Sequence, residues 1–403
     1  MIANLMALSV RARWTVLALF LVIAGLGVWQ LSKLPIDAVP DITNKQVQIN
    51  TIDPRLSPVE IEKLVTYPVE ISLAGIPGLE TTRSISRNGF SQVTAIFTDK
   101  TDLYFARQQV GERLRQAAEK LPEGVQPQVG PVTTGLGEIV MYTVGYANPD
   151  GRGAKKVAGQ PGWQPDGSYL TPEGDRLSDP VSKAGYLRTV QDWIISPQLR
   201  SVGGVAGVDS IGGYAKTFVV EPDPTKLASF GISYSELGQA LENANLAVGA
   251  NYYNRGGEAY LVRVDSRVRT VDEIRNAVAA TRGGVPITIG QIANVKIGGD
   301  LRTGAGSMNG NEAVIGTVLM LIGQNSRVVA EQSSAKLDQV AKTLPPGIEV
   351  KVVLDRAKLV SATVATVQRN LTEGAILVAA SLFLLLGNWR AALIAVLKIG
   401  LRH

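Results

Sequence analysis

The sequence predicts an α+β membrane protein in which two membrane helices flank one large region outside the membrane. Three observations support this fold class. An uncharged run near the start is long enough to cross a membrane, and a second apolar run lies near the end. Between the two runs, strand patterns and helix patterns follow one another in an order that occurs twice along the chain.

The first membrane helix is predicted between Arg13 and Lys33, where no residue is charged. This run matches the ~20 residues that a helix needs to cross ~30 Å of hydrocarbon. Trp14 and Trp29 stand near its ends, as aromatic residues do at membrane interfaces. A cleaved signal peptide is the alternative, but its apolar core would be ~7–15 residues long and followed by an A-x-A-like site. We therefore expect residues 1–33 to hold a cytoplasmic end and an uncleaved helix.

A second membrane helix is predicted within residues 356–389. Its apolar run begins at Gly374, and the preceding stretch LVSATVATVQRNLTEG could continue the same helix into the headgroup region. A buried helix of a soluble core is the alternative.

Basic residues flank both predicted membrane helices on their outer sides. Arg11 and Arg13 precede the first helix, and Arg390 and Lys398 follow the second. Positively charged flanks favour the cytoplasmic side. The residues between the two helices would then lie across the membrane, which in a bacterium is the periplasm.

The first part of this large region carries the pattern β-α-β-β-α-β. KQVQINT alternates as a strand does, and Ser57, Pro58 and Glu60 form a helix start with a capping box. The turn Arg87-Asn88-Gly89 joins two further strands into a hairpin. A helix over DLYFARQQVGERLRQAAEKLPEG and a short strand at VQPQVGP complete the set. This order is the split βαβ of a ferredoxin-like domain.

The same order recurs in the second part. EIVMYTVGY, VDSIGG, EAVIGTVLMLI and IEVKVVLD read as strands, with helices at YLRTVQDWIISPQLRSVGGVAG and SRVVAEQSSAKLDQVAKTLPPG. Paired stretches such as AEKLPEGVQPQV and AKTLPPGIEVKV indicate a duplicated half-domain. The second copy is interrupted between Tyr214 and about Gly298.

The interruption has an α+β pattern of its own. TFVVEPD predicts a strand, YSELGQALENANL a helix, and VGANYYNRGGEAYLVRV a hairpin that turns at Arg255-Gly256-Gly257. Such an arm suits an oligomer contact, and an ordinary surface hairpin is the alternative. Residues 148–185 are rich in Gly, Pro, Asp and Lys, so we expect a mobile surface loop with little structure there.

Composition excludes several classes of function. The chain has no Cys and one His, at position 403, which excludes a disulfide framework, a thiolate metal site and a multi-His site within these residues. Its basic residues are scattered, so we expect no nucleic-acid binding. No Gly-rich phosphate loop or G-x-S-x-G motif occurs, and we expect no enzyme and no catalytic residue.

Several stretches resemble the heavy-metal efflux branch of the resistance–nodulation–division (RND) transporters. They include LPIDAVPDITNKQVQINT, VTYPVE, QDWIISPQLRSVGGV, GTVLMLIGQNSR and GAILVAASLFLLLGNWRAALI. The match covers the chain in order up to about Val396. The form TGLGEI is more similar to the cobalt–zinc–cadmium type than to the copper–silver type.

The resemblance implies the pump subunit of a proton-driven exporter in the bacterial inner membrane, in contact with lipid. It implies a homotrimer that works with a periplasmic adaptor protein and an outer-membrane factor. The substrate would be zinc, cobalt or cadmium as a divalent cation, with no permanently bound cofactor. Residues 34–134 would form the first porter sub-domain, and residues 135–213 with 298–355 the second. Residues 214–297 would form a docking sub-domain whose hairpin reaches into the neighbouring subunit.

The final residues, LKIGLRH, depart from the family where a third membrane helix should stay apolar. We interpret residues 390–403 as the truncated start of that helix, in a truncated or frameshifted product or a fragment. In the family, the proton-relay acids and most ion ligands lie in the part beyond. We therefore expect residues 1–403 to transport nothing by themselves. A two-helix, membrane-anchored periplasmic binding or sensor module is the alternative function.

Glu138 is the carboxylate that we expect to face the ion path. It stands in TGLGEI at a strand start between the two porter repeats, and borderline divalent cations accept carboxylate oxygens as ligands. A solvated Glu at a strand edge is the alternative. Glu80 and Asp102 are secondary metal candidates. Asp37 and Asp41, in a proline-containing linker, are expected to fix the exit of the chain from the first membrane helix.

Overall fold

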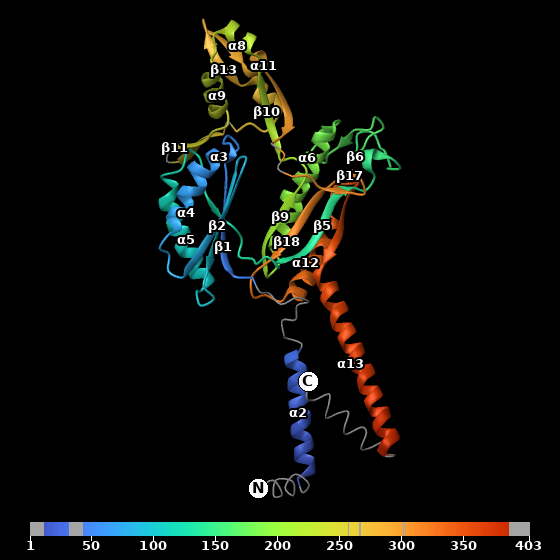
Figure 1. Cartoon of the computed structure of the whole chain (residues 1–403). Coiled ribbons are helices and arrows are strands. Elements are labelled where there is room, and N and C mark those ends of the chain that lie inside the picture. Colours follow the sequence, from blue (N-terminus) through green and yellow to red (C-terminus); the bar gives the residue numbers. More distant parts are fainter. Residues whose placement is uncertain are drawn as a thin grey trace.

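The computed structural model describes residues 12–31, 43–256, 258–265, 267–300, 302 and 304–386. Asp37, Asp41 and the expected third-helix start at residues 390–403 lie outside these residues. Figure 1 shows the long helices α2 (Arg13–Leu31) and α13 (Arg356–Leu386) below the main folded body, with a smaller body at the opposite end.

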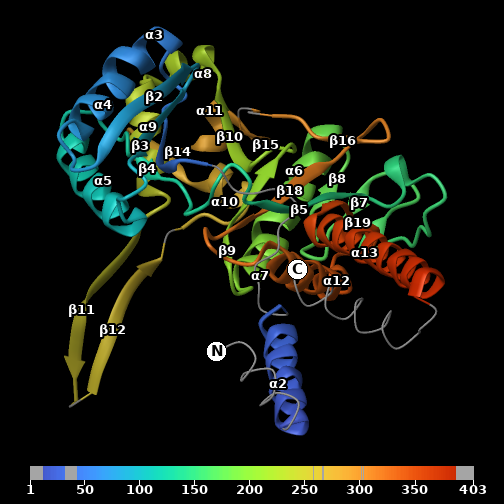
Figure 2. The ribbon, with the colours of Figure 1, turned by 60° about the horizontal axis from the view of Figure 1, so that its bottom comes forward.

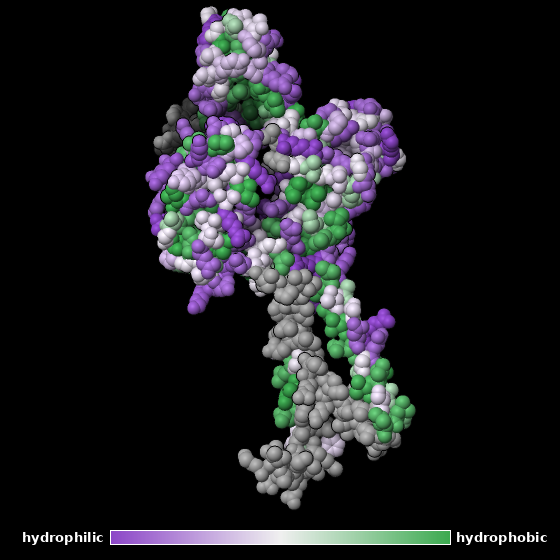
Figure 3. Space-filling model, viewed as in Figure 1, coloured by the Kyte–Doolittle hydropathy of each residue, from purple (hydrophilic) through white to green (hydrophobic). Residues whose placement is uncertain are grey.

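Both segments predicted to lie in the membrane are helical. Helix α2 spans Arg13–Leu31 and helix α13 spans Arg356–Leu386. Hydrophobic side chains are exposed along α13, among them Leu371, Leu377 and Leu384 (Figure 3). Across the described residues, no helix combines the length and the hydropathy that a membrane crossing requires.

The first sheet has four antiparallel strands in the order β2-β3-β1-β4. Its strands are β1 (Lys45–Ile52), β2 (Leu79–Arg87), β3 (Phe90–Phe97) and β4 (Gln128–Val129). Its helical segments are α3 (Pro58–Ile61), the π-helical turn η1 (Glu62–Thr66), α4 (Tyr67–Leu73) and α5 (Leu103–Ala118). Ile61, Val65, Val69 and Leu73 recur every four residues and are fully buried, so one face of the first helix seals the core over this sheet.

The second sheet repeats this arrangement, in the order β19-β5-β18-β9. Its strands are β5 (Glu138–Tyr146), β9 (Val205–Ile211), β18 (Val314–Met320) and β19 (Ile348–Asp355). Its helical segments are α6 (Pro180–Val190), the π-helical turn η3 (Gln191–Ile195), α7 (Ser196–Arg200) and α12 (Ser326–Ala341). Each repeat contributes four strands to its sheet. In both sheets the fourth strand of the repeat lies beside the first, the first beside the third, and the third beside the second. The internal repeat expected from the sequence is therefore present as matching topology.

The repeat extends to a proline-widened turn in the first helix of each copy. Tyr67 N–H donates to the Glu62 carbonyl and Ser196 N–H to the Gln191 carbonyl, each a five-residue step that directly precedes a proline. Proline has no N–H, and its ring would clash with the carbonyl four residues earlier in a regular helix. The wider π turn relieves this clash and lets each helix continue through the proline.

Residues 148–185 are ordered, so the prediction of a mobile loop with little structure was wrong. They form the short helical turn η2 (Pro149–Gly151) and a three-stranded sheet of β6 (Gly162–Trp163), β7 (Tyr169–Leu170) and β8 (Arg176–Leu177). Trp163 and Tyr169 are buried against Tyr146, with ring centroids 5.1–5.6 Å apart among the three. The prediction weighed composition, whereas these few aromatic rings bury enough apolar surface to fix the segment.

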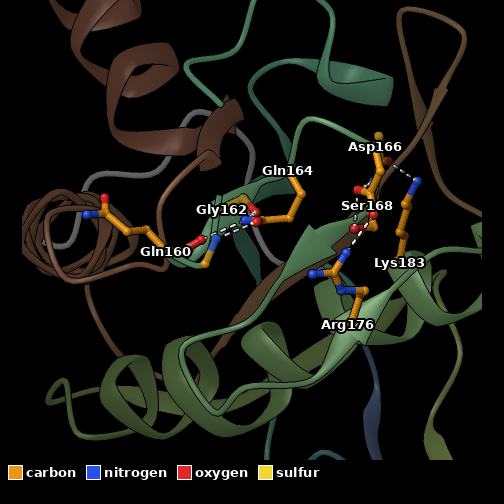
Figure 4. A network of polar contacts seen from close by, with 9 residues as sticks. Gln160, Gly162, Gln164, Asp166, Ser168, Arg176 and Lys183 are labelled. Atoms are coloured by element: carbon orange, nitrogen blue, oxygen red, sulfur yellow. Dashed lines mark hydrogen bonds and ion pairs between the residues drawn. The ribbon is translucent and has the colours of Figure 1, made fainter. Parts of the chain in front are cut away.

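Two networks of polar contacts also hold this segment, one around Gln164 and one around Asp166 (Figure 4). Gln164 is buried, and its Nε2 donates to the carbonyls of Gln160 at 2.7 Å and Gly162 at 3.0 Å. Asp166 accepts the hydroxyl of Ser168 at 2.6 Å and pairs with Arg176, and these hydrogen bonds lower the pKa of Asp166. Such local hydrogen bonds hold turns that contain few apolar residues.

The insert between the two parts of the second repeat is a separate small body with its own core. Its strands are β10 (Lys216–Pro222), β11 (Ala247–Arg255), β12 (Glu258–Asp265), β13 (Val278–Arg282), β14 (Val285–Thr288) and β15 (Ala293–Gly299). Its helices are α8 (Pro224–Phe230), α9 (Tyr234–Asn243), α10 (Val271–Asn276) and α11 (Ile289–Ile292). The predicted hairpin is present as β11 and β12, and its ribbon extends away from the other elements (Figure 2). A further small hairpin, β16 (Ser307–Met308) with β17 (Asn311–Glu312), follows the insert.

Candidate functional site

Glu138 is the first residue of β5 and ends the linker that joins the two sheets, residues 130–137. At the start of this linker, Gly130 N–H donates to the Gln48 carbonyl of the first sheet at 2.8 Å. At its end, Met320 N–H of the second sheet donates to the Gly137 carbonyl at 2.8 Å. The Glu138 side chain is exposed. Both sheets therefore hold the backbone that presents this carboxylate at their junction.

The conformation next to Glu138 requires a glycine. A Cβ atom on Gly137 would lie 1.8 Å from Thr133 Oγ1 and 3.0 Å from the Thr134 carbonyl oxygen. Within the described part of the chain, no hydrogen bond or ion pair engages the Glu138 carboxylate. The site thus offers an accessible carboxylate on a constrained backbone, which is able to serve as one ligand of a divalent cation.

The two secondary candidates lie elsewhere and differ in availability. Asp102 is the N-cap of α5, and its Oδ1 accepts the Phe105 N–H at 2.8 Å, so this carboxylate already has a structural role. Glu80 is exposed near the start of β2, where the pairing with β3 shifts register. Both residues belong to the first sheet unit, whereas Glu138 belongs to the second.

The structure does not gather these candidates into a metal centre. Over the residues that the structure describes, no three or more His, Asp or Glu side chains are placed to hold a metal ion. Zinc, for example, is usually bound by four ligands. An ion at Glu138 would therefore need further ligands from water or from other parts of a larger assembly.

A polar groove on the second sheet unit was missed by the sequence reasoning. Its volume is about 600 Å³, and its lining comes from the first helix of the repeat and β9: Arg188, Asp192, Ser196, Pro197, Arg200, Val208, Asp209, Ser210 and Ile211. Asp192 accepts Arg188 Nε at 2.6 Å and Ser210 Oγ at 2.7 Å. Desolvation raises the pKa of Asp209, and the charge of Arg200 opposes this rise. Because each carboxylate has an arginine nearby, the groove lacks the donor set of a cation site.

A larger groove, of about 1040 Å³, lies in the insert between α9, α10 and β13. Glu236 of α9 fixes one wall, because its carboxylate accepts Ser233 N–H at 2.9 Å and Arg282 Nη2 at 2.8 Å. Arg282 also donates to the Gly231 carbonyl at 2.9 Å. The Ser233 backbone hydrogen bond, with Arg282 beside it, lowers the pKa of Glu236 from 4.5 to about 2.

Acid is expected to loosen the first turn of α9 only below the ordinary pKa of glutamate. The folded-state pKa of Glu236 is depressed, so its contribution is complete above about pH 4.5 and is lost as the pH falls toward about 2. Amide hydrogen exchange of α9, expressed as protection factors, measures this loss. The variant Glu236→Gln should show low protection at the N-terminus of α9 over the whole range. A loss of protection in the unmodified chain well above pH 4.5 would contradict the assignment.

Comparison with known proteins identifies the family of this chain. The model of the AcrB/AcrD/AcrF family matches residues 5–402. The chain belongs to the AcrB/AcrD/AcrF family. Within this RND family, a crystal structure of a heavy metal efflux pump superposes with a TM-score of 0.82 at 30% identity, covering 98% of this chain and 36% of that one. The resemblance to the heavy-metal efflux branch is therefore confirmed.

Curated relatives in this family match all or nearly all of the chain. The nickel-cobalt-cadmium resistance protein NccA of Alcaligenes xylosoxydans xylosoxydans is 61% identical over 401 residues, which are 100% of this chain and 37% of NccA. The cobalt-zinc-cadmium resistance protein CzcA of Cupriavidus metallidurans is 47% identical over 98% of this chain and 35% of CzcA. The cation efflux system protein CusA of Escherichia coli K12 is 33% identical over the same shares. This chain thus spans a little more than a third of the length of these relatives.

Proposed function

We propose that this chain forms the N-terminal portion of an RND pump subunit that exports divalent heavy-metal cations, driven by proton entry. The observation that carries the proposal is the superposition on a heavy metal efflux pump over 98% of the chain. Glu138 adds local support, because its carboxylate lies at the junction of the two sheets and pairs with no other residue that the structure describes. The function is transport, with no catalytic residue and no resident cofactor.

The ion is a divalent cation of the cobalt, zinc and cadmium group. The full names of NccA and CzcA have cobalt and cadmium in common. The nickel and cobalt resistance protein CnrA, 61% identical to this chain, again has cobalt in its name. These ions accept carboxylate and imidazole ligands. Cobalt is therefore the first ion to test, followed by zinc and cadmium.

The sequence and the exposure of two helices support a placement in a membrane. Helix α2 is uncharged after Arg13, and α13 exposes leucines over its second half, including Leu377 and Leu384. Exposed apolar side chains of this kind are more stable in contact with lipid than with water. We place both helices in a bacterial inner membrane and the sheet units in the periplasm, with residues 34–134 as one porter sub-domain and 135–213 with 298–355 as the other.

The insert, residues 214–297, suits a docking sub-domain of a homotrimer. A two-stranded hairpin is at best marginally stable alone, so β11–β12 gains from a surface on another subunit. The groove of about 1040 Å³ between α9, α10 and β13 is a concave surface of the same insert. We propose that the hairpin of one subunit docks against the insert of the next. A periplasmic adaptor and an outer-membrane factor would complete the assembly.

Replacing Glu138 with glutamine in a complete pump is expected to lower cobalt efflux by about 10-fold or more, because an ion ligand loses its charge. The pump would join residues 1–396 of this chain to the remaining sequence of NccA. The measurement is cobalt and zinc accumulation in a strain that lacks its own pumps. Glu331→Gln makes the same change at an exposed position of α12 and should leave efflux unaltered. Unchanged efflux in Glu138→Gln would remove Glu138 from the ion path.

A further inference from the structure

Helix α13 begins with a buried arginine. Strand β19 ends at Asp355, and α13 starts at the next residue, Arg356, which is only 9% exposed. Asp355 fixes this junction, since its Oδ1 accepts Ala357 N–H at 3.0 Å and its Oδ2 accepts Ser334 Oγ of α12 at 3.3 Å. The first turn of α13 is therefore joined firmly to the second sheet unit.

The guanidinium of Arg356 reaches the linker that presents Glu138. Its Nη1 donates to the Leu136 carbonyl at 2.5 Å, although the two residues are 220 positions apart in the sequence. Leu136 lies two residues before Glu138. Burial of a guanidinium is unfavourable unless hydrogen bonds compensate for the water that it loses. Burying this guanidinium therefore costs more free energy than burying an apolar side chain. The hydrogen bond that compensates for the burial also fixes the direction in which the side chain points.

We propose that Arg356 is a positioning residue for ion export, which ties the first turn of α13 to the backbone that orients Glu138. This inference rests on the proposed function of Glu138 and extends it. Other backbone hydrogen bonds to the linker come from Gln48 of the first sheet and from Met320 of the second. Ile322, just after β18, also donates its N–H to the Val132 carbonyl at 3.2 Å. The Arg356 contact comes from the first turn of α13, and the last turns of the same helix are apolar. A shift of α13 along its axis would thus act on the Leu136 carbonyl.

The linker is built so that a movement of the Leu136 carbonyl can reach Glu138. Gly137 stands between Leu136 and Glu138, and its surroundings leave no room for a side chain. Gly137 N–H donates to the Thr134 carbonyl at 2.9 Å, which closes a tight turn just before β5. Because only Gly137 separates Leu136 from Glu138 and its N–H is held by this turn, we expect a displacement of Leu136 to reach the first residue of β5.

Transport by the complete pump tests whether Arg356 acts through Glu138. The variants are Arg356→Gln, Arg356→Lys, Glu138→Gln and the double variant Arg356→Gln/Glu138→Gln. The control is Arg369→Gln, which removes an exposed arginine of the same helix that pairs with Glu373 at 2.8 Å. Arg356→Gln should lower the maximal efflux rate about 10-fold, as supporting contacts of ion ligands do. Arg356→Lys should recover part of this rate, and Arg369→Gln should retain all of it.

The double variant decides between positioning and a general structural role. If Arg356 works by orienting Glu138, the double variant should transport no worse than Glu138→Gln alone. Losses that multiply in the double variant would overturn the proposal. An efflux rate in Arg356→Gln equal to that of the unmodified pump would also overturn it.

Hydrogen exchange separates this inference from the proposed function. In residues 1–403 held in detergent micelles, Arg356→Gln should speed exchange of the Gly137 amide about 10-fold or more, while Arg369→Gln should not. Unchanged exchange at β5 and β18 would show that the Arg356→Gln variant remains folded. If Arg356→Gln does not remain folded, the same measurement is made on Arg356→Lys. If Glu138→Gln leaves transport intact, the role of Glu138 fails, yet faster exchange at Gly137 still establishes the Arg356 contact. Unaltered exchange at Gly137 in Arg356→Gln overturns the inference whatever transport shows.

Discussion

Trp163→Ala is expected to cost about 3–5 kcal/mol of local stability, the range found when a buried large aromatic side chain is removed. Trp163 is 3% exposed in β6, and its ring packs edge-on against Tyr169 at 5.6 Å between centroids. Tyr169 in turn donates its hydroxyl hydrogen to the Pro346 carbonyl at 2.8 Å, just before β19. The loss should therefore spread from β6–β8 to the outer edge of the second sheet.

Amide hydrogen exchange of β7 and β19 in the full chain measures this effect, because local opening is read as a free energy for each segment. The matched control is Trp193→Ala. Trp193 belongs to the π-helical turn of the same unit but is 80% exposed, so its removal should change exchange by no more than about 0.5 kcal/mol. Equal effects of the two variants would show that residues 148–185 do not stabilise this sheet.

The regular elements of both sheets could be predicted because local patterns determine them. Ser57 with Glu60 forms the expected capping box, and the turn before Phe90 joins β2 and β3 as expected. Residues 148–185 could not be predicted in this way. Their order depends on Trp163 and Tyr169 meeting Tyr146 of another element, and no periodicity in the local sequence signals such contacts.

The candidate site also has one part that could be predicted from the sequence and another that could not. Glu138 could be placed at a strand start between the repeats, because the motif and the element order both lie in adjacent sequence. Arg356 could not be connected to Glu138, since Arg356 reaches only the backbone carbonyl of Leu136, which lies 220 positions away in the sequence. The polar groove with Asp192 and Asp209 was equally invisible, because its lining combines one helix with a strand that follows a glycine-rich turn.

Gly316→Ala is expected to destabilise the second sheet by about 3 kcal/mol, at the upper end of the usual cost of overpacking a core. Gly316 of β18 lies directly opposite Tyr142 of β5, and the tyrosine ring covers it. An added Cβ would lie 2.2 Å from Tyr142 Cζ and 2.5 Å from its hydroxyl oxygen. Tyr142 is fully buried, so its ring cannot move without displacing other core residues.

Gly145→Ala is the control for this prediction, because it adds the same methyl group to β5 of the same sheet. There the new Cβ would meet only Ala313 Cβ, at 4.0 Å, which is an ordinary contact. Gly in a strand is unfavourable by roughly 0.5–1 kcal/mol relative to Ala, so this variant should be neutral or slightly stabilising. Exchange of the β5 and β18 amides measures both variants.

A second substitution tests the cause of the Gly316→Ala effect. If the clash with the Tyr142 ring is responsible, Gly316→Ala should cost less in a Tyr142→Leu background than in the unmodified chain, with a coupling of about 0.5–3 kcal/mol. Strictly additive losses would assign the effect to the β18 backbone instead. The same pair bears on Glu138, which lies four residues before Tyr142 on β5, so a displaced ring also disturbs the strand that presents the candidate carboxylate.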